Sequence, residues 1–363
     1  MQAIVIFLFI AGLLNLAGGI LSVVSWPFVR RKYKKKPMLR KKTKASIIIP
    51  SKGNLNIKYF MEQKYDDYEI IVIVDSEEEK EDLERRIGGE KVRIAISKKF
   101  EGCSGKNAAL ITGIEIAKGE VLVFADDDIK PHPRWLYYLV ASLQDASTTY
   151  RWYFKNPLLC VWNAAITAIL FYKRFGFAWG GSTAIRKEVF ERNGIKDVWK
   201  RELVDDLTLT KILKEGGYEI KFVPQAIAES EEEKEIFKWM SKQFAWVRHY
   251  FPFLWKVALF FNLGMRVSNV AGLVVLFFYP TIGLLLLSSL LFDFIRGWQE
   301  YHTFVTLMEY PKEKFLSPAY HIVFRPVASF IISYNLLSSA FIKRVEWKGK
   351  KYSIPKVSLQ RRF

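Results

Sequence analysis

The sequence predicts an α/β domain with a parallel, helix-covered sheet, flanked by N- and C-terminal transmembrane helices. Two observations support this fold class. Between about residues 45 and 250, short β-branched runs alternate with helical stretches, an alternation typical of parallel sheets. Both flanks carry long apolar runs, and 50% of the 363 residues are hydrophobic, which is enough for a sizeable core.

The first element is an uncharged run from Ala3 to Val29. It is longer than the roughly 20 residues that a helix needs to cross a bilayer. We therefore predict a transmembrane anchor over residues 1–29. A cleaved signal peptide is the competing interpretation, but no basic leader precedes the run and its apolar part is too long.

A basic segment follows at residues 30–44, with ten lysines and arginines and no acidic residue. It contributes more than half of the net charge of +18. Basic residues beside a span stay in the cytoplasm, so we expect the N-terminus outside and the next domain cytoplasmic. Such a run contacts anionic lipid head groups more often than nucleic acid, and we predict no nucleic-acid partner.

The middle of the chain contains four predicted buried strands and two helices between them. The ligand of a parallel sheet lies beyond the carboxyl ends of its strands. Polar residues follow each strand, beginning with Ser51 after the first and Asp75 after the second. The strands are Ser46–Pro50, Glu69–Asp75, Val92–Ser97 and Val121–Asp126, and the helices lie in Glu77–Gly89 and Gly105–Gly119.

Three consecutive aspartates, Asp126 to Asp128, end the fourth strand. Like charges this close are costly unless a cation joins them, and Mn²⁺ or Mg²⁺ is the natural occupant. Asp126 and Asp128 would point the same way from an extended segment, with Asp127 facing away. Taken alone, the pattern is equally typical of an exposed acidic loop.

Two further charged positions lie at predicted helix starts. Lys106 follows Gly105 in a turn whose free backbone amides suit an anion, although Asn107 breaks the P-loop pattern. Asp205 and Asp206 open a helix that closes at Gly216. Capping explains one carboxylate there, but two are more than a cap needs.

The C-terminal third is predicted to be membrane-associated. The uncharged run Val270–Phe292 spans the bilayer with a kink at Pro280, whereas Tyr250–Arg266 is aromatic and short and lies in the interface. Two crossings return the basic tail to the cytoplasm. The predicted units are the α/β domain at 45–250, an interfacial helix at 251–268, transmembrane helices at 269–292 and 321–342, and a basic cytoplasmic tail at 343–363.

The succession SIIIPSKGN, IVIVDS, GKNAAL, VFADDDIKP, GGSTAIRKEVF, VDDLTLT and KQFAWVRHY resembles the family 2 glycosyltransferases. The order and the flanking apolar segments are most similar to the membrane-bound branch with ceramide glucosyltransferases and cellulose-synthase-like proteins. The resemblance implies a GT-A (Rossmann-like) nucleotide-sugar-binding fold and transfer of a sugar with inversion. One D-x-D motif is unspecific, but seven blocks in this order are highly specific.

The resemblance also implies roles for the matching residues. Asp206 corresponds to the general base, preceded by Asp205 in place of the family's glutamate. Asp126 and Asp128 correspond to the residues that hold the metal and the diphosphate. The implied donor-binding positions are Pro50, Ser51, Lys52, Asp75, Lys106, Asp126, Asp127, Asp128, Lys242, Trp246 and Arg248.

The last block departs from the family pattern Q/R-x-x-R-W. Lys242 stands at its first position, Ala245 at the arginine and Trp246 at the tryptophan. The missing arginine argues against processive synthesis, unless Lys242 or Arg248 supplies its charge. An amphipathic interface helix is the alternative interpretation of this segment.

The aromatic segment Thr148–Trp179 is long enough to span, but one more crossing would separate the D-x-D from Asp206. We expect it to contact the membrane and a lipid acceptor. The predicted function is transfer of a single sugar from a UDP- or GDP-sugar to a lipid-linked or glycan acceptor. The alternative is a catalytically degenerate nucleotide-sugar-binding scaffold of a polysaccharide synthesis or export complex. A processive synthase with a channel would need more membrane spans than the sequence predicts.

Overall fold

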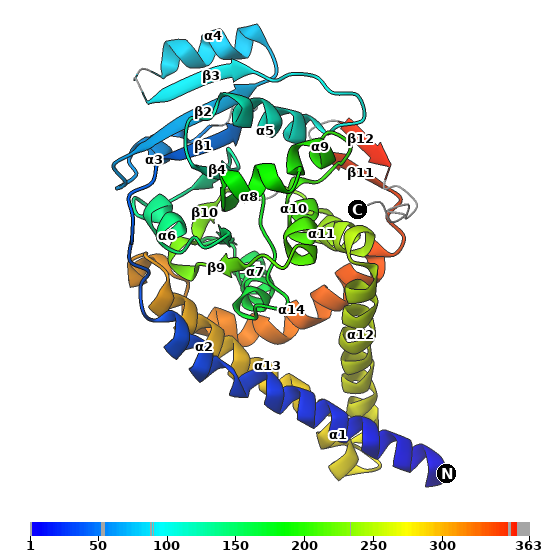
Figure 1. Ribbon diagram of the computed structural model, residues 1–363. Coiled ribbons are helices and arrows are strands. Elements are labelled where there is room, and N and C mark those ends of the chain that lie inside the picture. The colour runs from blue at the N-terminus through cyan, green and yellow to red at the C-terminus, as the bar shows by residue number, and fades with distance from the viewer. Residues whose placement is uncertain are drawn as a thin grey trace.

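The fold is built on a seven-stranded mixed sheet with strand order β3-β2-β1-β4-β8-β6-β9 (Figure 1). The computed structural model describes residues 2–51, 55–87, 89, 91–232, 234–347 and 350–353. The first four strands in this order are parallel, and β8 runs antiparallel to β4 and β6. The predicted parallel α/β fold is therefore confirmed. The strands are β1 (Ala45–Pro50), β2 (Tyr68–Val74), β3 (Val92–Ile96), β4 (Val121–Ala125), β6 (Ala146–Thr148), β8 (Ser182–Arg186) and β9 (Ile220–Phe222).

Helices cover both faces of this sheet because strand side chains alternate between two buried clusters. Ile48 and Phe124 face one cluster with residues of α5, α8, α9 and α10, whereas Ile47 and Val123 face the other with residues of α3 and α6. Burial on both faces explains why the strands are almost purely apolar. The helices are α3 (Ile57–Met61), α5 (Gly105–Ile116), α6 (Trp135–Ala141), α8 (Lys187–Arg192), α9 (Ile195–Trp199) and α10 (Asp205–Glu215).

A small second sheet and two further helices connect the domain to the apolar flanks. The sheet has the order β5-β10-β7, and α4 lies at the outer edge of the domain beside β3 (Figure 1). The elements are α4 (Glu77–Arg86), β5 (Ile129–Lys130), β7 (Arg151–Trp152), β10 (Ala228–Ser230), α7 (Pro157–Thr167), the short helix η1 (Ala168–Phe171) and α11 (Ile236–Tyr250).

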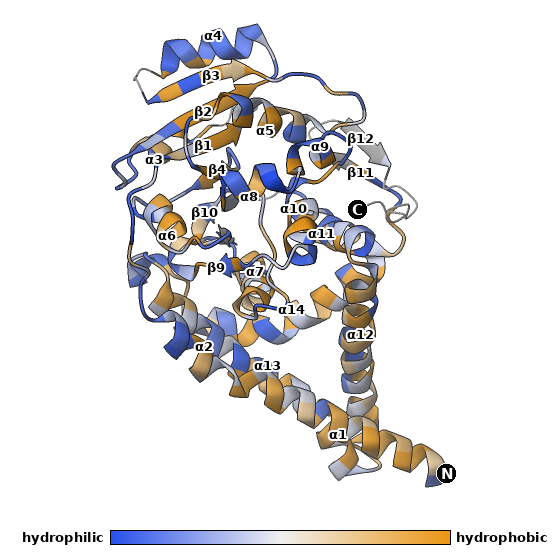
Figure 2. Ribbon diagram, viewed as in Figure 1, coloured by the Kyte–Doolittle hydropathy of each residue, from blue (hydrophilic) through white to orange (hydrophobic). Residues whose placement is uncertain are grey.

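Four segments of the described chain are long and apolar enough to cross a membrane. They are α1 (Gln2–Val24) with its continuation α2 (Trp26–Tyr33), α12 (Pro252–Val275), α13 (Pro280–Leu307) and α14 (Pro318–Ser339). Their surfaces are largely hydrophobic in Figure 2, in contrast to the hydrophilic α4. By their length and composition, these segments indicate a membrane protein.

The structure corrects the predicted C-terminal boundaries. The predicted span 269–292 is divided, since α12 ends at Val275 and α13 begins at Pro280. Proline suits the first turn of a helix and cannot continue a preceding one, so Pro280 starts a helix instead of kinking one. The predicted interfacial helix 251–268 is the first part of α12. The predicted span 321–342 corresponds to α14, which ends at Ser339.

The apolar helices are joined by close backbone contact and by buried charge. A Cβ atom at Gly12 of α1 would lie 2.7 Å from Leu285 of α13, so glycine permits the approach seen in Figure 1. Arg325 of α14 bonds Glu300 of α13 at 3.0 Å, and Arg266 of α12 bonds Asp293 of α13 at 3.0 Å. Buried charges are costly in an apolar surrounding, so these pairs fix how the three helices pack.

The predicted tail 343–363 forms a hairpin of β11 (Arg344–Trp347) and β12 (Lys350–Ser353). The remainder of the tail, 348–349 and 354–363, lies outside the described residues. Val345 is buried and borders the cavity described next. The hairpin therefore lies beside the α/β domain.

Candidate active site

A cavity of about 750 Å³ opens at the carboxyl edge of the parallel strands. Residues that follow strands β1, β2 and β4 meet there, as the parallel topology predicts. Lys52, also predicted to bind the donor, lies outside the described residues. The predicted residues that line the cavity are Pro50, Ser51, Asp75, Lys106, Asp126, Asp127, Asp128, Asp205, Asp206, Lys242 and Trp246.

Lys106 links the D-x-D segment to the acidic pair of α10. Its Nζ lies 2.8 Å from an oxygen of Asp126 and 3.3 Å from an oxygen of Asp205. Burial alone would lower the pKa of Lys106, but the surrounding aspartates outweigh it and hold that pKa well above its ordinary value. The lysine is therefore a permanent cation among the carboxylates.

Asp206 is held by two backbone amides. Its Oδ1 accepts a hydrogen bond from the N–H of Leu207 at 2.7 Å, and its Oδ2 accepts one from the N–H of Gly180 at 3.2 Å. Burial, reinforced by repulsion from Asp205, raises the pKa of Asp206 to about 7. A carboxylate that accepts protons near neutral pH has the property of a general base.

The turn Gly180–Gly181 presses its backbone against these charged groups. A Cβ atom at Gly180 would lie 2.2 Å from Asp205 Oδ2 and 2.8 Å from Lys106 Nζ. A Cβ atom at Gly181 would lie 2.6 Å from Asp126 Oδ2, and Gly181 accepts a hydrogen bond from the N–H of Asp126 at 3.2 Å. Glycine at both positions leaves room for these charged side chains, which a Cβ atom would displace.

Asp127 lies differently from the prediction. It is buried, with 7% of its surface exposed, and lines the cavity together with Asp126 and Asp128. The strand ends at Ala125, and Asp127 and Asp128 form a turn. The alternation expected of an extended segment therefore does not apply.

The described residues supply only some of the ligands that a divalent metal ion needs. No group of three His, Cys, Asp or Glu side chains in the described ranges is arranged to hold a metal ion. Asp126 and Asp128 nevertheless fit Mn²⁺ or Mg²⁺, which commonly take one or two carboxylates and complete their shell with phosphate oxygens. The pair suits an ion that arrives with a diphosphate.

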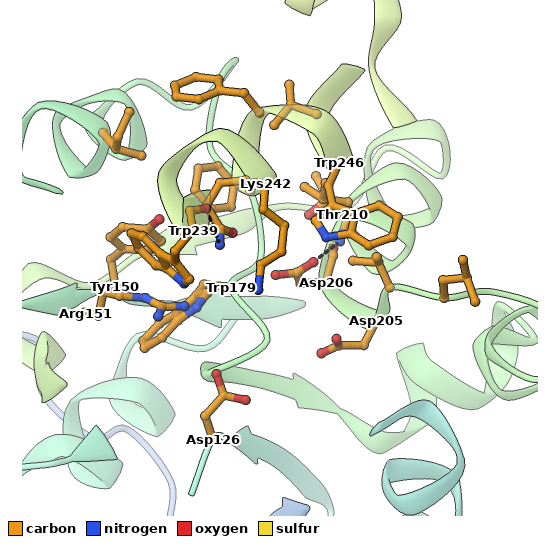
Figure 3. A pocket seen from close by; sticks show the side chains of 18 of the residues that line it. Asp126, Tyr150, Arg151, Trp179, Asp205, Asp206, Thr210, Trp239, Lys242 and Trp246 are labelled. Atoms are coloured by element: carbon orange, nitrogen blue, oxygen red, sulfur yellow. Dashed lines mark hydrogen bonds between the residues drawn. The ribbon is translucent and has the colours of Figure 1, made fainter. Parts of the chain in front are cut away.

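Arg151 of β7 was not predicted from the sequence, although it is a prominent cation of the cavity. Figure 3 shows its guanidinium among aromatic rings, and its Cζ lies 4.7 Å from the centre of Trp179 and 5.1 Å from that of Trp239. Burial disfavours its charge, but Tyr153, Tyr150 and the D-x-D aspartates raise the pKa of Arg151. In the sequence, only the aromatic stretch around Arg151 indicated that this residue could line a binding site.

The predicted donor-binding residues of α11 differ in where they lie. Lys242 and Trp246 line the cavity near Asp206 (Figure 3). Arg248 instead donates hydrogen bonds to the carbonyls of Ala340 and Ile342, the latter at 2.6 Å. It is not among the residues that line the cavity, so the structure does not bring Arg248 together with the other predicted donor-binding residues. Its side chain anchors the end of α14.

Ala245, which stands where the family pattern has an arginine, lies at a tightly packed position. Ala245 is fully buried in α11, with no exposed surface. A guanidinium there would need space that the packing does not provide. Besides Lys106, the cations Lys242 of the same helix and Arg151 of β7 line the cavity.

The other end of the cavity is apolar. Its wall comes from the predicted aromatic segment, through Trp162, Ile166 and Ile169, and from α12, through Leu254 and Phe261. Ile169 is 40% exposed and Phe261 61% exposed. The cavity thus connects the carboxylates with an exposed apolar surface on a candidate membrane helix.

The protein is an α/β protein with carboxylates and cations gathered at the carboxyl edge of its parallel sheet, the edge at which such folds bind their ligands. The profile described as "Glycosyltransferase like family 2" matches residues 57–249, and that described as "Glycosyl transferase family 21" matches residues 161–358. Each match covers more than half of the chain. The chain belongs to the family 2-like glycosyltransferases, and the predicted resemblance is confirmed.

Individual relatives are more distant. The probable glycosyltransferase YdaM of Bacillus subtilis is 26% identical over an alignment of 193 positions, and the match covers 48% of this chain and 45% of that protein. The chain thus spans about half the length of this curated relative. The mannosyltransferase PcManGT of Pyrobaculum calidifontis, solved with GDP-Man and Mn²⁺, is 15% identical with a TM-score of 0.49, over 92% of this chain and 98% of that chain.

A second solved structure is the glucosyl-3-phosphoglycerate synthase of Mycobacterium tuberculosis, in complex with Mn²⁺ and UDP-glucose. It is 16% identical with a TM-score of 0.37, over 53% of this chain and 73% of that chain. Both TM-scores lie below 0.5. The family assignment therefore rests on the profile matches and the sheet topology.

Proposed function

We propose that this protein is a membrane-bound glycosyltransferase that moves a single sugar, with inversion, from a UDP- or GDP-sugar to a lipid or lipid-linked acceptor. One observation carries the proposal. A single cavity contains the carboxylates and cations suited to a sugar nucleotide at one end and exposed apolar side chains at the other. A donor and a lipid can therefore meet within it.

Asp206 is proposed as the general base. An acceptor hydroxyl must lose its proton as its oxygen attacks the anomeric carbon, and a carboxylate with a pKa near 7 accepts that proton at neutral pH. The bond to the leaving diphosphate breaks as the new bond forms on the opposite face, which inverts the anomeric centre. The backbone amides of Leu207 and Gly180 hold the base in place.

The leaving diphosphate gains negative charge, and the cavity offers cations to offset it. Lys106, Arg151 and Lys242 approach from three different elements. Asp126 and Asp128 would hold Mn²⁺ or Mg²⁺, which supplies Lewis-acid stabilisation of the phosphates when bound. Arg151 and Lys242 take over the charge of the arginine that Ala245 replaces.

The acceptor would bind along α7, η1 and α12. Trp162, Ile166 and Phe261 offer an apolar wall that a sugar or a soluble acceptor would not need. Burying apolar surface there contributes about 25 cal/mol per Å². An acceptor with hydrocarbon chains, such as a diacylglycerol, a sphingolipid-like molecule or a polyprenyl phosphate, suits this wall.

The proposed topology places the N-terminus outside and the catalytic domain in the cytoplasm. We propose that α1, α12 and α13 cross the membrane and that α14 does not. The segment before α14 contacts the domain, because Tyr310 accepts a hydrogen bond from the N–H of Glu229 at 3.0 Å. The end of α14 is held by Arg248 of α11. With both ends against the domain, α14 lies along its base.

The test is incubation of membranes containing the protein with radiolabelled UDP- and GDP-sugars and Mn²⁺, followed by thin-layer separation of the lipid products. We expect one labelled lipid, absent from membranes with the Asp206→Asn variant. Donor binding measured by calorimetry without any product, across several lipid extracts, would instead support the nucleotide-sugar-binding scaffold.

A further inference from the structure

A second, smaller cavity lies between α2 and the end of α13, away from the candidate active site. Its volume is about 400 Å³. Three basic residues line it, together with Pro27 and Thr306. The basic residues are Arg30, Arg31 and Lys34, all of them exposed.

No acidic side chain of the described residues pairs with these three cations. In the described part of the chain, none of their side chains forms an ion pair or a hydrogen bond. Lys36, two residues further on, is different, since it pairs with Glu309. Cations gathered around one cavity repel each other unless an anion joins them. An anion with several acceptor oxygens, such as a phosphate, fits this set.

The position of the cavity relative to the bilayer indicates the source of that phosphate. Helix α2 begins directly after α1, whose exposed apolar side chains suit the bilayer interior. Phe28, in the same short helix, is 72% exposed. Apolar and basic side chains side by side at the end of a span are typical of the head-group region. The cavity is thus level with lipid phosphates.

Helix α2 also contacts the wall of the acceptor end. The Tyr33 and Phe171 rings are 5.0 Å apart at their centres, and those of Trp26 and Phe171 are 5.9 Å apart. The Tyr33 hydroxyl donates a hydrogen bond to the Phe171 carbonyl at 3.3 Å. Phe171 ends η1, which includes the cavity-lining Ile169. A ligand that fixes α2 therefore fixes η1.

We propose that this cavity is a binding site for the phosphate of an anionic phospholipid, and that its occupation orders the acceptor end of the central cavity. The site is distinct from the donor and acceptor sites. Its lipid binding does not depend on the proposed glycosyl transfer, whereas its effect on the acceptor end rests on that function.

The test compares two triple variants of the full chain that remove equal charge. One replaces the cavity residues, as Arg30→Gln, Arg31→Gln and Lys34→Gln. The matched control replaces exposed basic residues of the same segment outside the cavity. The control changes are Lys32→Gln, Lys35→Gln and Arg40→Gln.

Binding of phosphatidylglycerol is measured by native mass spectrometry in neutral detergent, where no charged bilayer attracts the basic segment as a whole. We expect about tenfold or greater loss of affinity in the cavity variant and less than about twofold in the control. Equal loss in both variants, or equal affinity for phosphatidylcholine, overturns the site. Displacement of the lipid by millimolar inorganic phosphate alone overturns its assignment to a lipid.

Discussion

Replacing Asp206 by asparagine is expected to lower activity and raise stability together. The change keeps the size of the side chain and removes its charge. Loss of a general base lowers the rate by roughly 10² to 10⁴, or about 3–5 kcal/mol of transition-state stabilisation. The wild-type rate should rise with pH up to a plateau, because the base is active only when deprotonated and its pKa is about 7.

The stability effect has the opposite sign. The pKa of Asp206 is higher in the folded than in the unfolded protein, so ionising it costs stability as pH rises from about 4 to 7. At about 1.4 kcal/mol per pKa unit the full cost is near 4 kcal/mol. Asparagine has a single acceptor oxygen, so one of the two backbone N–H groups loses its partner, which offsets part of the gain. We expect the variant to be more stable by about 1–3 kcal/mol at pH 8 and equal to wild type near pH 4.

The rate is measured as labelled lipid formed per unit time, and stability as the Tm of the detergent-purified protein at both pH values. Asp197→Asn is the matched control, an exposed carboxylate paired with Lys200 at 2.8 Å and outside the cavity. It should change neither quantity by more than about 0.5 kcal/mol. An Asp206→Asn variant with a wild-type rate, or one destabilised at pH 8, would refute the reasoning.

Four further outcomes are expected. Chelation by EDTA should abolish product formation, and Mn²⁺ or Mg²⁺ should restore it; full activity without metal contradicts the proposal. Arg151→Ala should raise the KM for the donor more than Arg151→Lys does, by about tenfold for a lost charge contact, whereas equal kinetics of both variants would exclude a charge role. Gly180→Ala should abolish activity and lower the Tm, because its Cβ would meet Asp205 at 2.2 Å; an unchanged Tm argues against that packing. Lys242→Ala should weaken donor binding in calorimetry, whereas Arg248→Ala should lower the Tm and leave donor affinity unchanged, and a reversed pattern would reassign the two residues.

The sequence predicted the parts of the site that depend on local pattern. Apolar runs of strand length define β1 to β4, and the residues after a parallel strand reach the ligand edge whatever the rest of the fold does. Asp126 and Asp75 follow from that rule. Lys106 and Asp206 lie at helix starts, which have their own sequence signals.

The missed features depend on packing between distant segments. Arg151 stands in a short strand without a motif, and its place between Trp179 and Trp239 is visible only once three segments meet. Arg248 was misassigned because a motif position does not reveal a partner 94 residues away. The turn before Pro280 was missed because an apolar run continues through it, and hydropathy does not register a reversal of direction.

The turn between α12 and α13 has a consequence for the fate of the product. It comprises residues 276–279 and lies at the same end of the molecule as the N-terminus (Figure 1). In the proposed topology, this turn lies on the far side of the bilayer from the α/β domain. In the proposed function and topology, a glycolipid would therefore form in the cytoplasmic leaflet, on the side of the bilayer that faces the α/β domain.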